Sequence, residues 1–90
     1  VSPTKFELYQ NYPNPFNPST DINFYVPHLS PVSISIYNIQ GKLIEKLVDR
    51  IFKPGHYTAH LNSQEYASGI YLYHMEVKNA TYTRKFIIIK

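Results

Sequence analysis

One stretch decides the fold class: Val32-Ser33-Ile34-Ser35-Ile36-Tyr37-Asn38-Ile39-Gln40-Gly41. Aliphatic and polar side chains alternate over residues 32–37. Because successive side chains of a strand point to opposite faces, this segment would bury its aliphatic side and expose its serines. Gly41 can take the positive φ that closes a turn with a bulge between antiparallel strands. The pattern therefore predicts a strand, a turn and a partner strand over residues 43–48.

A short amphipathic helix is the alternative for residues 42–50. Leu43, Leu47 and Ile51 would share one face of such a helix. The hairpin turn directly before this segment favours the strand.

Turn signals at fairly regular intervals divide the rest of the chain in the same manner. Pro54 and Gly55 are typical of a type II turn, in which proline fixes φ at the first central position and glycine accepts a positive φ at the second. The polar and small residues 62–69 indicate a loop with room for one helical turn. A central strand is expected to begin directly after Gly69. The expected strands lie near residues 6–9, 21–26, 32–37, 43–48, 56–61, 70–77 and in a last segment ending at 86–90. Seven short strands predict an all-β, seven-stranded antiparallel immunoglobulin-like β-sandwich.

The composition agrees with a small β-domain. Ninety residues are too few to fill two hydrophobic cores, so residues 1–90 are expected to form a single domain. Nine tyrosines and five phenylalanines against three glycines favour β-structure, and the absence of cysteine rules out disulfides and thiolate chemistry. The expected parts are a linker and first strand (residues 1–11), a proline-rich segment (12–20) and the remaining strands (21–90).

The charge distribution limits the possible partners. A net charge of +3 is too weak for a dedicated nucleic-acid-binding protein, so no nucleic-acid partner is expected. Residues 78–90 hold four basic side chains and no acidic one. A basic last strand could steer an acidic partner, or its charges could only protect an exposed sheet edge from aggregation. The sequence leaves both interpretations open.

Membrane and targeting signals are missing as well. No apolar run approaches the roughly 18 residues that cross a bilayer, so no transmembrane segment is expected. Residues 1–5 lack the apolar core of a signal peptide, and the chain has no initiator methionine. We therefore expect a fragment of a longer exported protein whose own export signal lies upstream.

A proline-rich segment precedes the second expected strand: Tyr12-Pro13-Asn14-Pro15-Phe16-Asn17-Pro18-Ser19-Thr20. Each proline pushes the residue before it to extended backbone angles, so the segment is stiff without being a strand. It is expected to cross one end of the sandwich while Tyr12 and Phe16 insert between the sheets. The alternative is a ligand for an aromatic groove on another protein.

The same segment resembles the opening motif of the type A C-terminal sorting domains of the bacterial type IX secretion system. Four further segments are similar to motifs of that family and follow in its order. They are the hairpin Ile36-Tyr37-Asn38-Ile39-Gln40-Gly41-Lys42, the turn Pro54-Gly55-His56-Tyr57, the element Ala67-Ser68-Gly69-Ile70-Tyr71 and the closing motif Arg84-Lys85-Phe86-Ile87-Ile88-Ile89-Lys90. The resemblance covers about residues 8–90. It departs at His60 and Asn62, where relatives often carry tryptophan and aspartate, so packing at that end is expected to differ.

The resemblance implies a non-enzymatic sorting signal without cofactor or metal. Such a domain is exported to the periplasm with an upstream cargo on the same chain and is recognised there by the outer-membrane translocon and its shuttle protein. A surface sortase then removes it and usually attaches the cargo to lipopolysaccharide, so the cargo is expected at the cell surface or outside the cell.

Two sets of residues follow from the resemblance. Recognition is expected to involve the last hairpin, where Lys85 and Lys90 supply charge and Gly69 and Tyr71 set its orientation. The candidate recognition residues are Gly69, Tyr71, Arg84, Lys85 and Lys90. The motif residues expected to have structural roles are Tyr12, Pro13, Asn14, Pro15, Phe16, Gly41, Pro54 and Gly55.

Catalytic and metal-binding patterns are missing from the sequence. His56 and His60 would stand about 13 Å apart along one face of a strand, too far apart to share a zinc ion. The six carboxylates are scattered, and none of the three glycines belongs to a nucleophile elbow or a phosphate loop. Neither a catalytic site nor a metal site is therefore expected.

Two weaker patterns concern carbohydrate. Asn79-Ala80-Thr81 fits the N-glycosylation acceptor pattern at an expected hairpin tip, but the match is short and common by chance, and a plain turn explains it equally. Five tyrosines could form a sugar-stacking strip if they shared one face: Tyr25, Tyr37, Tyr71, Tyr73 and Tyr82. Such a strip would favour the rival function, an accessory adhesion or carbohydrate-binding module that stays on a secreted protein.

Overall fold

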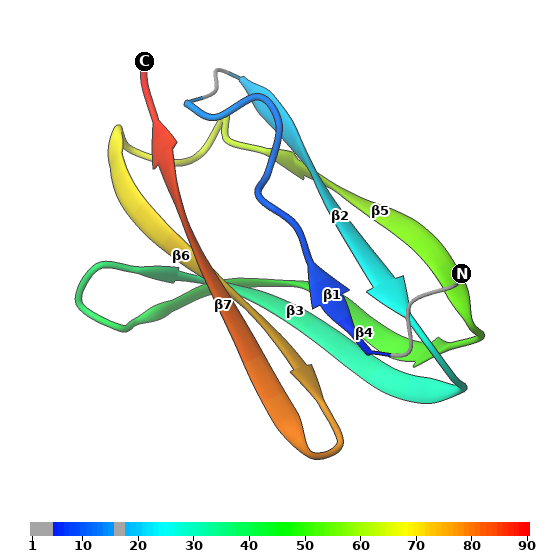
Figure 1. Ribbon diagram of the computed structural model, residues 1–90. Coiled ribbons are helices and arrows are strands. Elements are labelled where there is room, and N and C mark those ends of the chain that lie inside the picture. The colour runs from blue at the N-terminus through cyan, green and yellow to red at the C-terminus, as the bar shows by residue number, and fades with distance from the viewer. Residues whose placement is uncertain (1–4, 16–17) are drawn as a thin grey trace.

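The computed structural model describes residues 5–15 and 18–90, and these form seven β-strands (Figure 1). The strands are β1 (Glu7–Leu8), β2 (Ser19–Val26), β3 (Ser30–Asn38), β4 (Leu43–Phe52), β5 (Gly55–Asn62), β6 (Gly69–Val77) and β7 (Ala80–Ile88). Every expected strand is present, and residues 43–52 form a strand in place of the alternative helix. Residues 62–69 end β5 and enter β6 through a turn closed by a hydrogen bond from the Tyr66 amide to the Ser63 carbonyl (2.9 Å).

The strands form two antiparallel sheets that pack face to face. One sheet has the order β1-β2-β5 and the other the order β4-β3-β6-β7. The expected immunoglobulin-like sandwich is therefore confirmed, with β6 in the centre of its sheet and β7 at an edge. In the constant-type arrangement the fourth strand joins the first, second and fifth, whereas here β4 extends the opposite sheet.

The core lies between the two inner faces. Alternate residues of β2 and β3 point inward and are almost fully buried, as are alternate residues of β6. Across the sheet Ile36 pairs with Tyr73, while Phe24 of the facing sheet meets Phe52 edge to face with ring centroids 5.3 Å apart. Burying each large side chain of this kind stabilises the fold by roughly 2 kcal/mol. The residues packed in this core are Leu8, Ile22, Phe24, Val26, Val32, Ile34, Ile36, Phe52, Ala59, Leu61, Tyr66, Tyr71, Tyr73, Met75, Phe86 and Ile88.

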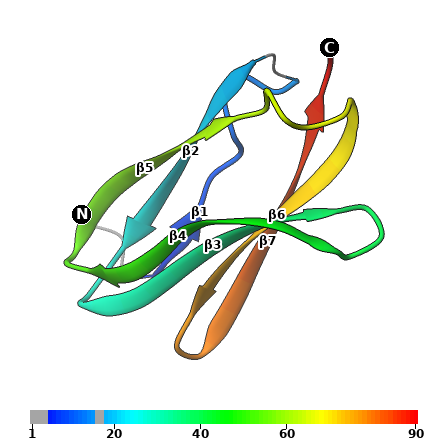
Figure 2. The ribbon, with the colours of Figure 1, turned by 180° about the vertical axis from the view of Figure 1, so that it is seen from behind.

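The hairpin of β3 and β4 projects beyond the rest of its sheet, which Figure 2 shows from behind. Gly41 has φ +87°, and its amide donates to the Asn38 carbonyl (2.9 Å). The Asn38 side-chain oxygen also accepts hydrogen bonds from the Gln40 and Lys42 amides (2.9 and 3.0 Å). The positive φ expected at Gly41 is confirmed.

The type II turn expected at Pro54 and Gly55 is wrong in its geometry. Gly55 has a positive φ, but at +149° rather than the roughly +80° that a type II turn requires. The physical reason is topological. Because β4 and β5 belong to different sheets, Lys53 and Pro54 carry the chain across the sandwich, and Gly55 already pairs with Val26 as the first residue of β5.

Insertion of Tyr12 between the sheets is also wrong. The Tyr12 backbone exchanges two 3.0 Å hydrogen bonds with Asp21 at the start of the sandwich, and its side chain is 79% exposed. Asn11 is buried instead, and because neighbouring side chains of an extended segment point to opposite sides, Tyr12 faces solvent. Phe16, the second aromatic residue expected to insert there, lies outside the described residues.

Candidate functional site

The candidate recognition residues gather on the last two strands. Gly69 and Tyr71 lie at the start of β6, Arg84 and Lys85 lie on β7, and Lys90 follows the end of β7. The antiparallel register places Gly69 opposite Ile88 and Tyr71 opposite Phe86. The structure thus brings Gly69, Tyr71 and the end of the chain together, while Lys85 lies further along the hairpin, opposite Leu72.

Tyr71 holds the loop that precedes β6. Its ring is buried and stacks on Phe86 (centroids 5.6 Å apart, planes at 18°), and its hydroxyl donates to the Ala67 carbonyl (2.8 Å). Gly69 has φ +153°, and nothing lies within 4 Å of the place where a β-carbon would stand. Backbone conformation rather than space therefore favours glycine at this position.

Lys90 ties the end of the chain to the same loop. Its amide donates to the Ser68 hydroxyl (3.0 Å), and its ammonium group donates to the Gln64 carbonyl (2.9 Å). Part of the charge expected to attract a partner is therefore used to fix the chain end over the loop.

Tyr66 is a residue of this region that the sequence did not mark. Its hydroxyl donates to the Glu45 carboxylate (2.6 Å), and burial, together with this hydrogen bond, raises the pKa of Tyr66. A hollow of about 350 Å³ opens beside this pair, between β4 and the loop before β6. Its lining residues are Ile44, Glu45, Glu65, Tyr66, Ala67 and Tyr71. No local pattern predicts this contact, because it joins a strand to a loop 21 residues further along the chain.

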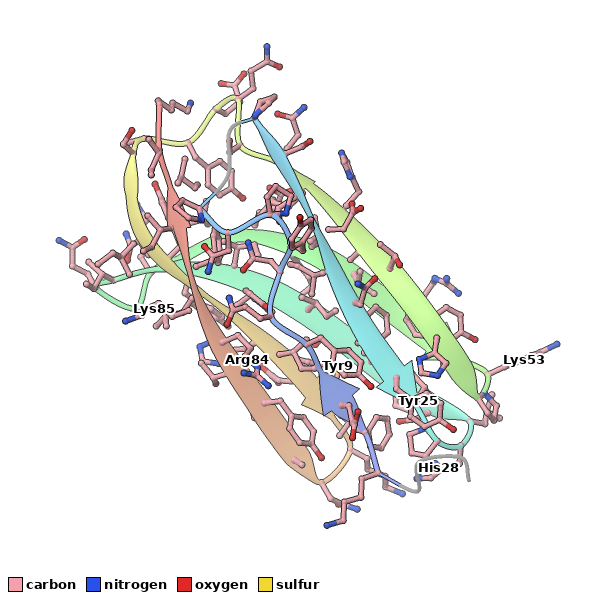
Figure 3. All side chains as sticks on the ribbon, turned by 45° about the horizontal axis from the view of Figure 1, so that its top comes forward. Tyr9, Tyr25, His28, Lys53, Arg84 and Lys85 are labelled. Atoms are coloured by element: carbon pink, nitrogen blue, oxygen red, sulfur yellow. The ribbon has the colours of Figure 1, made fainter. Side chains whose placement is uncertain are left out.

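The two adjacent basic residues of β7 leave the strand on opposite sides. Figure 3 shows Arg84 on the side of β1 and Tyr9, and Lys85 pointing the other way. The Arg84 guanidinium donates to the Leu8 carbonyl (3.0 Å), so it connects β7 to β1 across the sandwich edge. Lys85 is exposed and offers its charge to the outside.

The segment before β2 closes this edge of the sandwich. Residues 9–15 of this segment run between β2 and β7 in Figure 1, and two of their side chains hydrogen-bond the outer edge of β7. The Asn14 side-chain oxygen accepts from the Ile87 amide (3.0 Å), and the Gln10 side chain donates to the Lys85 carbonyl (2.7 Å). The proline-rich motif is therefore bonded directly to the closing motif of the chain.

Buried polar groups support this closure from inside. The Tyr73 hydroxyl accepts from the Asn11 amide (2.9 Å) and donates to the Tyr9 carbonyl (2.6 Å). The Asn11 side chain donates to Thr20 and to the Pro13 carbonyl (both 3.1 Å). Burial raises the pKa of Tyr73 to about 12, although the Asn11 hydrogen bond and the Arg84 charge act in the opposite direction. Nothing in the sequence marked Asn11 as buried, since asparagine is a residue type found mostly at surfaces.

The tyrosines proposed as a sugar-stacking strip do not share a face. Tyr71 and Tyr73 are buried in the core, Tyr37 lies on the opposite face of the same sheet, and Tyr25 belongs to the other sheet. Asn79 does lie at the tip of the β6–β7 hairpin. In residues 5–15 and 18–90, no three His, Asp or Glu side chains are grouped in a way that could hold a metal ion. That part of the chain also contains no helix long and apolar enough to cross a membrane.

Fold and site together define a class of protein: a small immunoglobulin-like β-sandwich in which the chain end and the opening motif are bonded to each other. A family model described as the secretion system C-terminal sorting domain matches residues 10–90, and the chain belongs to this family. It is therefore a C-terminal sorting signal of the type IX secretion system, which directs export toward the cell surface or the extracellular space. Searches of curated proteins and of solved structures gave no significant match.

Proposed function

We propose that residues 1–90 act as one non-enzymatic domain whose last hairpin is the element that the secretion machinery reads. The cargo on the same chain enters the periplasm, the domain folds there, and the outer-membrane translocon and its shuttle protein recognise it. A surface sortase then removes the domain from the cargo. The family assignment supports the general course of this route.

One observation carries the assignment of the hairpin. All five candidate residues lie on β6, on β7 or on the chain directly after them, and the loop before β6 is fixed from both sides. Lys85 then supplies the exposed charge, whereas Gly69, Tyr71 and Lys90 hold the shape of this end. Arg84 acts by connecting β7 to β1.

A secretion assay tests this function. A fluorescent reporter exported to the periplasm and carrying residues 1–90 at its C-terminus is expressed in a bacterium with a type IX system. The intact reporter should be released or displayed at the surface, and mass spectrometry should show that the domain has been removed. Deleting residues 86–90 should leave the reporter in the periplasm, and normal secretion of this truncation would refute the proposal.

Loss of Phe86 and Ile88 also removes part of the core, so a matched pair of glycine variants separates recognition from folding. Gly69 and Gly55 have nearly the same positive φ (+153° and +149°). They are the first residues of β6 and β5, which begin at opposite ends of the molecule in Figure 1. An alanine at either position should destabilise the domain by about 1 kcal/mol, because both backbones are strained for an L side chain. Gly69→Ala should reduce secretion well below the level of Gly55→Ala at equal stability. Equal secretion of the two variants would show that this end of the hairpin is not recognised.

A further inference from the structure

The two outer faces of the sandwich differ in character. On the β1-β2-β5 sheet, polar side chains on neighbouring strands bond to one another. Thr58 donates to the Asn23 side chain (2.6 Å), and His60 lies 2.8 Å from the Asp21 carboxylate. This face is polar and satisfied within itself, as expected of a surface that meets only water.

The outer face of the other sheet carries an apolar area near Gly69. Residues on neighbouring strands pair there in a row, Leu43 with Tyr37 and Tyr37 with Leu72, and Ile70 pairs with Ile87 in a second row. Leu43 and Ile70 are 49% and 41% exposed, although both lie on strands. We name Tyr37, Leu43, Ile70, Leu72 and Ile87 the outer patch.

The rows toward the Lys78 end of the same face are polar. Ser35 pairs with His74, whose ring nitrogen lies 2.7 Å from the Thr83 hydroxyl. Ser33 pairs with both Asp49 and Glu76. The outer patch is therefore a local feature with a sharp polar border, not a property of the whole sheet.

The charge at the border is positive. Lys85 is the next residue in the row of Tyr37 and Leu72, and no partner for its ammonium group is found among the residues that the structure describes. Lys46 lies at the far side, 3.7 Å from Asp49. Asp49 and Glu76, the acidic residues of the Ser33 row, lie two rows away from the row of Tyr37 and Leu72.

We propose that the outer patch is the surface by which this domain docks onto a protein of the secretion machinery, and that the partner presents an apolar surface with a carboxylate that meets Lys85. This rests on the proposed function, since it names the face of the signal that is read. Apolar side chains at the centre and a charge at the rim form the usual anatomy of a transient protein interface.

The charges favour a partner protein over the other possible occupants. Two copies of this chain stacked patch on patch would offer Lys85 no carboxylate within the contact, because Asp49 and Glu76 lie two rows away from the patch and Asp49 is already paired with Lys46. An anionic lipid surface is held by clusters of about 4–8 basic residues, far more than Lys85 and the distant Lys46 supply. A carboxylate on a protein partner, in contrast, satisfies one exposed lysine.

The secretion reporter with residues 1–90 tests the docking surface through charge reversal. Lys85→Glu and Leu72→Glu should each lower secretion by about tenfold or more, because a buried contact is replaced by repulsion. Two matched controls should secrete within about twofold of the wild type: Thr58→Glu adds the same acid to the polar face, and Lys53→Glu reverses an exposed lysine at the far end. Lys85→Arg keeps the charge and should therefore secrete better than Lys85→Glu.

Lys85 is exposed, so Lys85→Glu should melt at the wild-type temperature, and this variant keeps the test valid even if Leu72→Glu does not fold. Normal secretion of Lys85→Glu and of Ile70→Glu would overturn the docking surface. If the 86–90 truncation is still retained in the periplasm and Gly69→Ala is secreted less than Gly55→Ala, the proposed function stands without the docking surface. If the truncation is secreted too, the proposed function itself fails.

Two further measurements decide the occupant. Purified protein is mixed with phosphatidylglycerol vesicles, and binding that Leu72→Glu abolishes would overturn the protein partner in favour of lipid. Sedimentation equilibrium that shows a dimer dissolved by Leu72→Glu would overturn it in favour of a second copy. If the purified protein is a monomer and does not bind the vesicles, the secretion defect of Lys85→Glu supports the protein partner.

Discussion

The two edges of the sandwich, where the two sheets meet, differ in structure: one is closed by hydrogen bonds and the other stays open. At the edge between β1 and β7, the segment before β2 bonds to the last strand through Gln10 and Asn14, and Tyr73 joins it from inside. At the edge between β4 and β5, a hollow of about 210 Å³ remains, lined partly by Phe24, Phe52 and Tyr57. There the Arg50 guanidinium lies 3.9 Å from the centre of the Phe52 ring and shields it from water.

This difference shows where a small domain without disulfides places its buried polar groups. The polar network lies at the edge that contains the closing motif, and it connects that motif to the opening motif. The other edge uses apolar contacts and exposed side chains. Substitutions at the hydrogen-bonded edge between β1 and β7 should therefore lower the free energy of unfolding strongly. Similar substitutions at the open edge between β4 and β5 should lower it little.

The largest expected effect comes from a matched pair of Tyr→Phe substitutions. Tyr73→Phe leaves the buried Asn11 amide and the partly buried Tyr9 carbonyl without their partner, which should lower the free energy of unfolding by roughly 3 kcal/mol. Tyr57→Phe removes a hydroxyl that donates to the Lys53 carbonyl in an exposed position (2.6 Å), where water can replace it. Urea unfolding of the two variants measures the difference. Similar losses in both would show that the edges are energetically alike.

The strands of this fold were predictable because their signal is local. Alternation over residues 32–37 fixes which side chains of β3 point inward, and Gly41 fixes the following turn. The pairing of β4 with β3 was predictable too, because the turn at Gly41 joins the two strands directly. The pairing of β3 with β6 was not predictable, because these strands are far apart in the sequence and no local pattern shows which strands become neighbours.

The candidate recognition residues were proposed from the sequence, but the directions of their side chains could not be predicted from it. The motifs marked the last hairpin, yet only the register shows that Arg84 faces β1 while Lys85 faces outward. The burial of Asn11 depends on contacts with Tyr73 and Thr20, which are distant in sequence. Because Asn11 takes the inward position, the expected place of Tyr12 could not be correct.

The next expected effect is a dependence of stability on alkaline pH. Burial raises the pKa of Tyr73 from 10.0 to about 12 in the folded state. The neutral hydroxyl is therefore favoured by folding, and its contribution is complete below pH 10 and is lost as pH rises through 12. The loss should reach about 2 kcal/mol at pH 12.

Tyr73→Phe is the control for this pH dependence. The variant keeps Tyr66 and all lysines, so the gap in unfolding free energy between it and the wild type should narrow from pH 9 to pH 12. Urea unfolding at several pH values measures this gap. A constant gap would mean that Tyr73 does not ionise in the unfolded chain at lower pH than in the folded one.

The smallest expected effect compares one arginine at each edge. Arg84→Met keeps the aliphatic stem but removes the hydrogen bond to the Leu8 carbonyl, so it should lower the free energy of unfolding by about 1 kcal/mol. Arg50→Met removes only a cation–π contact at an exposed edge, for which a loss of about 0.5 kcal/mol is expected. Thermal unfolding of both variants at low and high salt resolves the order. Since Arg84 bonds to a neutral carbonyl, its contribution to the free energy of unfolding should change little with salt. A larger loss of stability for Arg50→Met than for Arg84→Met would contradict this order, because the edge between β4 and β5 would then depend more on its arginine.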